Sequence, residues 1–362
     1  MFSRVMTGGF LISLLAACGG ATPATAPTTA PAGGAATAAP AGDTAPTTAP
    51  AGDTATTAPV ASGEKTRLTI GTGGTGGVFF PYGGGIARIL TEKMSNTEAT
   101  AQETGGSVDN LKLLQTGEAQ IGFSTVDSAF DAINGTGAYA QTGAVNAQAI
   151  AVLYESFVHI VATQESGVTD IASMKGKRVS VGSAGSSTEA AAERVIEAGG
   201  LDPQTDITRE NLSVADSVSA MKDGKIDVFF WIGGLPTSAV TDLTTTGTPA
   251  VTFITSGQYV QPMVEKYGPL YKEMMLPAST YSNVAADVAG VGIGNILVVG
   301  SDLSEDTVYT ILKTMFDNLA ETQAIHPEAK KLSLETAWTG SSIPFHPGAI
   351  RFYREQGVWK DS

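Results

Sequence analysis

A glycine-rich loop between a predicted strand and a predicted helix constrains this chain more than any other feature. Residues 67–70 alternate in polarity and predict a strand, and five glycines follow within 71–77. Apolar residues at helical spacing then predict a helix over 83–94, so residues 78–82 are expected to lengthen the loop. Because glycine permits close backbone approach and a helix N-terminus has unpaired N–H groups, this region is suited to binding a small anion.

The first eighteen residues predict export and attachment to a membrane. Arg4 is the only charge before an apolar run, Val5–Ala17, that is too short to span a bilayer. The run ends in LAAC, which resembles a bacterial lipobox, so we expect a signal peptide over 1–17 and a lipid on Cys18. An ordinary signal peptide with an incidental cysteine is the alternative. Since Cys18 is the only cysteine, no internal disulfide is expected.

Residues 18–63 predict a disordered linker between the lipid anchor and the folded part. Apart from Cys18, they are almost entirely Ala, Thr, Pro and Gly, and the hexapeptide PAGDTA occurs at 40–45 and again at 50–55. Such a segment cannot bury enough apolar surface to offset the entropy of ordering it. We therefore expect an extracytoplasmic protein that is tethered by lipid to the bacterial cell membrane.

The charge balance excludes one class of partner and limits how an anion can be held. The formal net charge is −14, and no cluster of lysine and arginine is present. Nucleic acid is therefore not an expected partner. Since the overall charge repels anions at long range, an anion site has to rely on local dipoles and hydrogen bonds.

The remaining sequence alternates between strand and helix signals, which predicts an α/β fold. Strands are expected at 99–102, 121–124, 150–153, 158–162, 179–181, 226–231, 251–254 and 292–299. Helices are expected at 108–115, 125–133, 188–198, 216–222, from Gly233 with Pro236 in the first turn, at 305–325 and at 347–356.

Two strand–loop–helix series, each with its own Gly/Ser loop, predict two similar lobes facing across a cleft. The expected division places 64–158 and 296–362 in lobe 1 and 159–295 in lobe 2. Ligands of open α/β sheets bind beyond the carboxyl ends of the strands, so the ligand is expected in the cleft between the lobes.

The glycine loop also fits a dinucleotide-binding fingerprint, Gly71-x-Gly73-x-x-Gly76, with Glu103 ending the next predicted strand. An exported NAD-dependent oxidoreductase is therefore a remote alternative. Export and the long loop oppose this interpretation, since nicotinamide cofactors are scarce outside the cell. A phosphate-binding P-loop is weaker still because no Gly-Lys-Ser/Thr follows.

Between residues 66 and 359 the chain resembles the TAXI subfamily (TRAP-associated extracytoplasmic immunogenic) of TRAP-transporter solute-binding proteins. Six motifs carry the resemblance in order: 69–78 (TIGTGGTGGV), 103–111 (ETGGSVDNL), 175–182 (KGKRVSVG), 230–236 (FWIGGLP), 294–299 (GNILVV) and 346–349 (HPGA). The sequence departs from the family at Ser279, where a glycine is common, and at 283–291.

The resemblance implies a two-lobed type II periplasmic-binding fold with a hinge. It also implies a small carboxylate ligand, such as glutamate, glutamine or 2-oxoglutarate, and delivery of that ligand to a TRAP membrane permease. A sensory module for a signalling receptor is the alternative, because one fold serves both uses. A neighbouring permease gene favours transport, and a neighbouring sensor-kinase gene favours sensing.

The candidate ligand-binding residues come from the loops at the predicted strand ends and from nearby aromatic residues. They are Thr72, Gly73, Thr75, Gly76, Gly77, Val78, Phe79, Thr104, Gly105, Ser107, Ser124, Tyr154, Ser183, Ser186, Ser187, Thr188, Trp231 and Gly233. Tyr82 is a further candidate wall residue.

Several of these residues also have purely structural interpretations. The glycines can serve close packing alone, and Phe79 and Trp231 can belong to the core. Asn110 can be a cap or a tie between elements rather than a ligand contact, and Asn295 can serve a hinge, a pocket or the core.

No motif for catalysis or cofactor binding is recognised. His159, His326 and His346 are far apart in the sequence and have no metal-ligand spacing, and His346 is interpreted as part of a turn. A Gly-x-Ser-x-Gly elbow is absent from the sequence. We therefore expect neither enzymatic activity nor a metal or organic cofactor.

Overall fold

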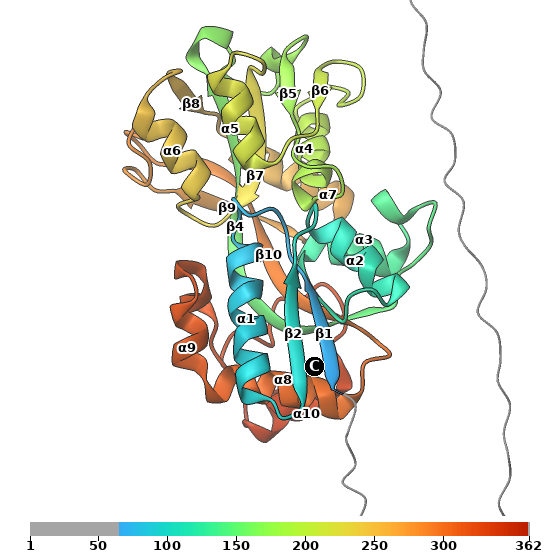
Figure 1. Cartoon of the computed structure of the whole chain (residues 1–362). Helices are drawn as coiled ribbons and strands as arrows, with labels where there is room; N and C mark the ends of the chain where they lie inside the picture. Colours follow the sequence, from blue (N-terminus) through green and yellow to red (C-terminus); the bar gives the residue numbers. More distant parts are fainter. Residues whose placement is uncertain (1–64, 361–362) are drawn as a thin grey trace, which may run out of the picture. The chain divides into compact units, whose positions relative to one another are not determined.

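Figure 1 shows the computed structural model, which describes residues 65–360. The predicted signal peptide, the lipid on Cys18 and the whole 18–63 linker lie outside this range, so those predictions stay untested. Within 65–360 no helix is both long and apolar enough to cross a bilayer.

One mixed sheet organises the folded part. Within the described residues it contains ten strands: β1 (Thr66–Gly71), β2 (Thr97–Gln102), β3 (Ile121–Thr125), β4 (Ala147–Thr163), β5 (Arg178–Ser180), β6 (Thr208–Glu210), β7 (Val228–Gly233), β8 (Val251–Phe253), β9 (Tyr271–Leu276) and β10 (Val288–Gly300). The strand order is β2-β1-β3-β10-β4-β7-β5-β6, with β8 beside β4 and β9 beside β10.

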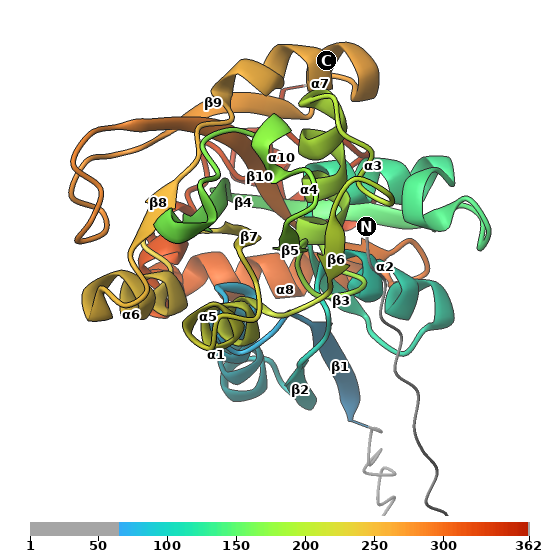
Figure 2. The same ribbon diagram turned by 90° about the horizontal axis from the view of Figure 1, so that it is seen from above.

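Two long antiparallel strands, β4 and β10, connect two sets of parallel strands. On one side, β10 pairs with β3, which continues into β1 and β2; we call this set the first half. On the other side, β4 pairs with β7, which continues into β5 and β6; this is the second half. Figures 1 and 2 show helices around both halves. The predicted α/β class is confirmed.

The helices follow the strands in the order that an α/β pattern requires. Within the described residues the α-helices are α1 (Phe79–Lys93), α2 (Ser107–Thr116), α3 (Val126–Asn134), α4 (Ser187–Ala198), α5 (Val214–Lys222), α6 (Ser238–Thr246), α7 (Val260–Tyr267), α8 (Glu305–Asp317), α9 (Leu319–Ala324) and α10 (Pro347–Glu355). In α1, Ile86, Ile89 and Leu90 are fully buried, because their helical spacing places them on one face.

Three clusters of buried apolar side chains hold the helices on the sheet. One contains residues of α1, α8 and α10, among them Ile86, Ile311 and Phe352. Another lies under α5 and α6, and the largest joins α2, α3 and α4 across the sheet. Removing such surface from water stabilises the fold by roughly 25 cal/mol per Å².

Two expected boundaries near prolines differ in the structure. α1 begins at Phe79 rather than at residue 83, so the loop before it is shorter than predicted. Pro81 lies in the first turn, where its missing N–H is not needed by the helix. Pro236 does not start a helix: it follows a cis peptide bond, and α6 begins at Ser238.

One strand is longer and one helix is shorter than the sequence predicted. The strands predicted at 150–153 and 158–162 form a single strand, β4, because β10 and β7 together pair along it through the polar residues 154–156. The helix predicted over 305–325 is interrupted at Asn318, whose amide donates to the Thr314 carbonyl at the end of α8. The strands β6 and β9 and the helix α7 were not predicted.

Ser279, where the resemblance led us to expect glycine, has a positive φ of 67°. It lies in a tight turn in which its N–H donates to the Val284 carbonyl at 2.8 Å. A β-carbon is disfavoured in that region of φ, which explains why glycine suits the position.

Candidate ligand-binding site

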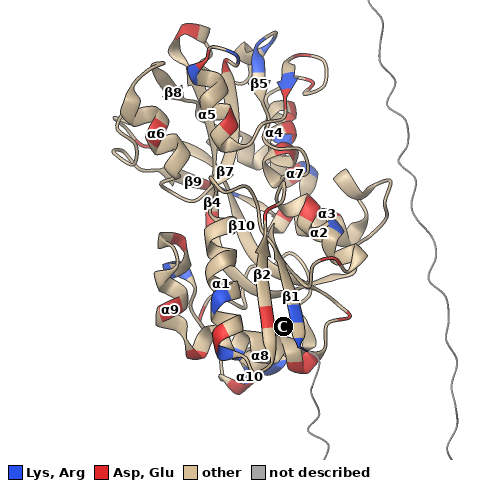
Figure 3. Cartoon of the chain, viewed as in Figure 1, with Lys and Arg blue, Asp and Glu red and all other residues tan. Residues whose placement is uncertain are grey.

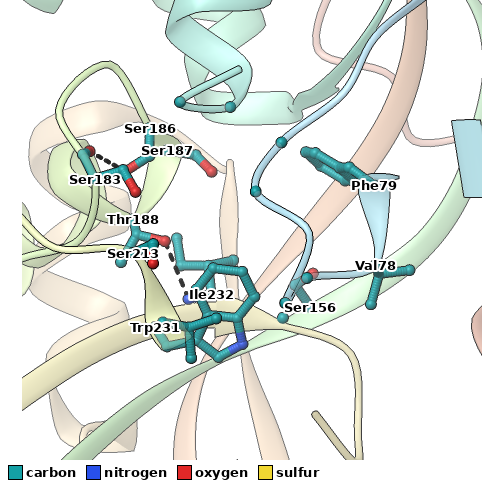
Figure 4. A pocket seen from close by; sticks show the side chains of 18 of the residues that line it. Val78, Phe79, Ser156, Ser183, Ser186, Ser187, Thr188, Ser213, Trp231 and Ile232 are labelled. Carbon is teal, nitrogen blue, oxygen red and sulfur yellow. Dashed lines mark hydrogen bonds between the residues drawn. The ribbon is translucent and has the colours of Figure 1, made fainter. Parts of the chain in front are cut away.

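A cavity lies between the first and second halves, at the carboxyl ends of their parallel strands. Its volume is about 170 Å³, which is room for on the order of ten water molecules. A small metabolite fits this space, whereas a dinucleotide is much larger. Figure 4 shows Val78 and Phe79 on one side, with Ser183, Ser186 and Ser187 on the other.

Five helices begin at the wall of this cavity. The residues that precede their first turns all border it: Val78 before α1, Gly106 before α2, Thr125 before α3, Ser186 before α4 and Ser213 before α5. Each N-terminus has N–H groups without intrahelical acceptors and the positive end of a helix dipole. The cavity is therefore suited to an anionic group.

The N-terminus of α1 is the least compensated of the five. No side chain caps it, and its first turn contains no acidic residue. The other four helices have Asp109, Asp127, Glu189 and Asp216 in their first turns. A negative group at α1 would therefore gain the most from the helix dipole, about 0.3–1 kcal/mol at an exposed end and up to about 2 kcal/mol when partly buried.

The loop before α4 is satisfied by its own side chains. The Ser186 hydroxyl accepts from the Glu189 N–H at 3.1 Å and donates to the Ser183 carbonyl at 2.6 Å. The Glu189 carboxylate accepts from the Gly185 N–H at 2.9 Å and also pairs with Arg209. The predicted capping spacing of Ser186 and Glu189 is confirmed by the first of these bonds.

The two long strands contribute Tyr154 and Ser156 from β4 and Asn295 from β10 to the cavity wall. Asn295 lies opposite Tyr154 in the strand register, which shifts between Asn295 and Ile296. Its side-chain N–H₂ donates to the Tyr154 carbonyl at 3.1 Å and to the Ser156 hydroxyl at 2.9 Å.

Two aromatic side chains border opposite parts of the cavity. Phe79 packs on Phe123 with ring centroids 5.0 Å apart. The Trp231 indole N–H donates to the Thr237 hydroxyl at 2.9 Å, which fixes the ring. A β-carbon on Gly77 would lie 2.9 Å from that ring, so glycine is needed there for close approach. Both aromatic residues therefore serve packing and the cavity wall.

Charged groups at the cavity are acidic. Among the described residues that border it, Glu103 and Asp216 carry charge, and neither lysine nor arginine is present. Glu103 accepts from the Thr75 N–H at 3.3 Å, and Asp216 accepts from the Ser213 hydroxyl at 2.7 Å. Figure 3 shows the basic residues distributed over both halves. An anion bound here would have to depend on backbone dipoles.

The two halves touch beside the cavity through main-chain groups and glycines. The Asp109 N–H on α2 donates to the Gly185 carbonyl at 3.1 Å. A β-carbon on Gly105 would lie 2.4 Å from the Ala184 carbonyl oxygen, and one on Gly185 would lie 2.1 Å from Asp109. Gly105 is required because its obstacle is main chain, and Gly185 is favoured because its φ is +73°.

A buried charged network also joins the halves. Arg194 on α4 pairs with Asp131 and, at 3.6 Å, with Asp127, both on α3. The Asp127 carboxylate accepts from the Thr125 hydroxyl at 2.5 Å, and Thr125 borders the cavity. Removing one partner of such a pair would leave a buried charge without compensation.

Fourteen of the predicted site residues border the cavity: Gly73, Thr75, Gly76, Gly77, Val78, Phe79, Gly105, Tyr154, Ser183, Ser186, Ser187, Thr188, Trp231 and Gly233. The hydroxyl groups of the other four are bonded elsewhere. Thr72 donates to Gln102, Thr104 donates to Asn110, Ser107 accepts from the Thr125 N–H, and Ser124 donates to the Thr125 carbonyl.

Sequence reasoning missed other cavity residues, among them Gly106, Thr125, Ser156, Ser213, Val214, Ala215 and Ile232. The signal for Ser213 was present, because it lies three residues before Asp216 in a capping pattern. Asn110, singled out in the sequence, is a structural tie: it donates to the carbonyls of Thr72 and Phe123. Tyr82 is fully buried and does not border the cavity.

The histidines have structural partners. His346 caps α10 by accepting from the Gly348 N–H at 3.1 Å, so it has the expected structural role, but as a helix cap rather than in a turn. His159 is buried; Nδ1 lies 3.1 Å from the Phe157 carbonyl, and Nε2 accepts from the Tyr281 hydroxyl at 2.8 Å. Burial lowers the pKa of His159 to about 4, so it is neutral at pH 7. Within 65–360, no three His, Cys, Asp or Glu side chains could hold a metal ion.

Three solved structures of binding proteins show some similarity to this chain. The alkanesulfonate-binding protein SsuA of Xanthomonas axonopodis pv. citri, bound to MOPS, is 16% identical with a TM-score of 0.42, over 82% of each chain. A binding protein of an ABC phosphonate transporter from Pseudomonas aeruginosa is 11% identical with a TM-score of 0.46, over 73% of this chain and 79% of that one.

An ancestral arginine-binding protein is 13% identical with a TM-score of 0.44, over 75% of this chain and all of that one. The sequence itself matches a family description over most of its length. Residues 70–357 fit the model of the NMT1-like family, and this range includes every element that borders the cavity. The chain therefore belongs to the NMT1-like family.

Proposed function

We propose that this chain is an extracytoplasmic solute-binding protein that captures a small carboxylate. The observation that carries the proposal is the convergence of five helix N-termini on one cavity bordered by neither lysine nor arginine among the described residues. Backbone N–H groups and helix dipoles can hold a carboxylate without a basic side chain. Glutamate, glutamine and 2-oxoglutarate are the proposed ligand class.

The carboxylate would occupy the N-terminus of α1. That end has neither a side-chain cap nor an acidic residue in its first turn, so its N–H groups are left for a ligand. Ser187 and Thr188 begin α4 on the opposite wall and would contribute N–H and hydroxyl groups from the second half. Trp231 and Phe79 would exclude water from the bound ligand.

Capture would involve closure of two lobes about the long strands β4 and β10. The proposed lobes are 64–158 with 296–362, and 159–295, so that both boundaries fall within β4 and β10. Docking of the closed, lipid-anchored protein on a TRAP-type permease is the proposed next step. The ligand shifts the protein toward the closed form only to the extent that it binds the closed form more tightly than the open form.

A thermal-shift panel tests the ligand class. A ligand that binds only the folded protein stabilises it by mass action and so raises Tm. At a ligand concentration of one hundred times Kd, the gain in the free energy of unfolding is about 2.7 kcal/mol. We expect glutamate, glutamine or 2-oxoglutarate to raise Tm and neutral sugars to leave it unchanged. A shift with a sugar or an inorganic cation, and none with any carboxylate, would contradict the proposal.

Calorimetric titration with NAD and NADP tests the oxidoreductase alternative. The cavity of about 170 Å³ is small for a dinucleotide, so no heat of binding is expected. Gly71, the first glycine of the fingerprint, packs against the side chain of Asn110 instead of bordering the cavity. Saturable binding of either cofactor would restore the alternative.

A further inference from the structure

The side chain of Asn295 has an acceptor without a partner at the wall of the cavity. Asn295 is fully buried, and its Oδ1 has no hydrogen-bond partner among the described residues. Both hydrogens of its side-chain amide are used, by the Tyr154 carbonyl and the Ser156 hydroxyl. Because the Tyr154 carbonyl can only accept, it fixes the amide with Nδ2 on that side and Oδ1 on the other.

The local strand geometry holds this acceptor in place. The register between β10 and β4 shifts directly after Asn295. Such irregularities redirect side chains and are common beside binding sites. Buried polar groups nearly always have partners, so the unpaired amide oxygen of a residue that borders the cavity points to a donor on a bound group.

The remaining charges at the cavity indicate what kind of group this is. Glu103 and Asp216 are the charged residues on the described wall, and both are acidic. Both side chains are exposed to solvent, so their attraction is screened, but it favours a ligand that carries a positive charge in addition to its carboxylate. An ammonium group satisfies this requirement and donates N–H to an amide oxygen.

We propose that Asn295 is a specificity-determining residue whose Oδ1 accepts a hydrogen bond from the ammonium group of an amino-acid ligand. The site thereby selects amino acids over keto acids of the same carbon skeleton. This inference rests on the proposed carboxylate-binding function and adds the donor that the ligand must carry. A keto oxygen would face Oδ1 as a second acceptor and would leave both oxygens unpaired.

The direct test compares L-glutamate with 2-oxoglutarate by calorimetry on the unaltered protein. The two compounds share a skeleton and differ at the amino or keto carbon. We expect L-glutamate to bind roughly 10- to 100-fold more tightly, the effect of leaving a buried acceptor unpaired. Equal affinity would overturn the role of Asn295 while leaving carboxylate binding intact. Binding of neither compound would contradict the proposed function as well.

Two variants separate specificity from structure. In Asn295→Ala the ratio of the two dissociation constants should fall to within about threefold of one, even if both affinities decline. Ser180→Ala is the matched control: Ser180 is buried, bonds Ser217 at 2.8 Å and does not border the cavity. The control should keep the ratio of the unaltered protein. An unchanged ratio in Asn295→Ala would overturn the proposal.

Discussion

The loops before α1 and α4 face each other across the cavity, yet they are stabilised in different ways. The α4 loop has a serine cap and a glutamate that bonds the loop, and Arg209 neutralises that glutamate. The α1 loop is built from glycines, and neither a cap nor an acidic first turn compensates its helix. The α4 loop is therefore held by its own side chains, whereas the start of α1 has no comparable compensation within the described residues.

This difference suggests that the two loops have different roles. The α4 loop and its supports act as a fixed wall, whose loss should reduce stability. In the proposed function, the α1 loop and Asn295 would contact the ligand, so altering them should change affinity more than stability.

The largest expected effect concerns pH and the second half. His159 on β4 bonds the Trp231 and Phe157 carbonyls, and its pKa is lowered to about 4 by burial. Because the unfolded chain binds the proton at about pH 6.5, stability should be fully present above that pH and fall by about 3 kcal/mol as the pH drops to 4. Urea unfolding between pH 7 and 4 measures this decline.

His159→Gln is the control for that experiment, since carboxylate titration affects both proteins alike. The variant should be less stable at pH 7 and lose less stability between pH 6.5 and 4. Parallel pH profiles for the two proteins would show that His159 is not the group responsible.

Gly185→Ala in the α4 loop should clearly lower stability. Gly185 has a φ of +73°, and its β-carbon would lie 2.1 Å from Asp109 of the first half. We expect a loss of about 2 kcal/mol in the free energy of unfolding. Gly74→Ala in the α1 loop is the matched control, because nothing lies within 4 Å of its β-carbon. A similar loss in both variants would remove the distinction between the loops.

Ser186→Ala should lower stability by about 1 kcal/mol, because the Glu189 N–H loses its cap. Ser304→Ala removes an equivalent cap from α8, away from the cavity. Chemical denaturation should give similar losses for both variants. Calorimetry should show weaker ligand binding only for Ser186→Ala, and weaker binding in both would mean that the loss is not local.

The smallest expected effect is on the α1 side. The hydroxyl of Tyr82 is buried without a partner among the described residues, so Tyr82→Phe should keep or raise stability, by up to about 1 kcal/mol. Tyr353→Phe is the matched control and should lose about 1 kcal/mol, because its hydroxyl donates to the Ile150 carbonyl at 2.9 Å. Thermal unfolding distinguishes the two variants. If Tyr82→Phe lost as much stability as the control, the Tyr82 hydroxyl would have a hydrogen-bond partner after all.

Much of the fold could be predicted because the chain alternates clearly between apolar strands and capped helices. Ser186 and Glu189 identified one helix start, and the glycine loop marked the other wall of the cavity. The continuity of β4 could not be predicted, because pairing with β7 and β10 outweighs the polar residues 154–156.

Side-chain direction accounts for the site residues that sequence reasoning misplaced. Thr104 and Ser124 lie in the expected loops or strand ends, but their hydroxyls bond Asn110 and the main chain. Asn295 was noticed as a polar residue in an apolar strand, but only the register shift and the bonds of its amide nitrogen leave its oxygen unpaired at the cavity.

The most direct test of the central claim is a crystal structure of the protein with L-glutamate. We predict a ligand carboxylate within hydrogen-bond distance of the N–H groups that begin α1, with neither lysine nor arginine in contact. A carboxylate held by a basic side chain, or a ligand bound outside this cavity, would contradict the account.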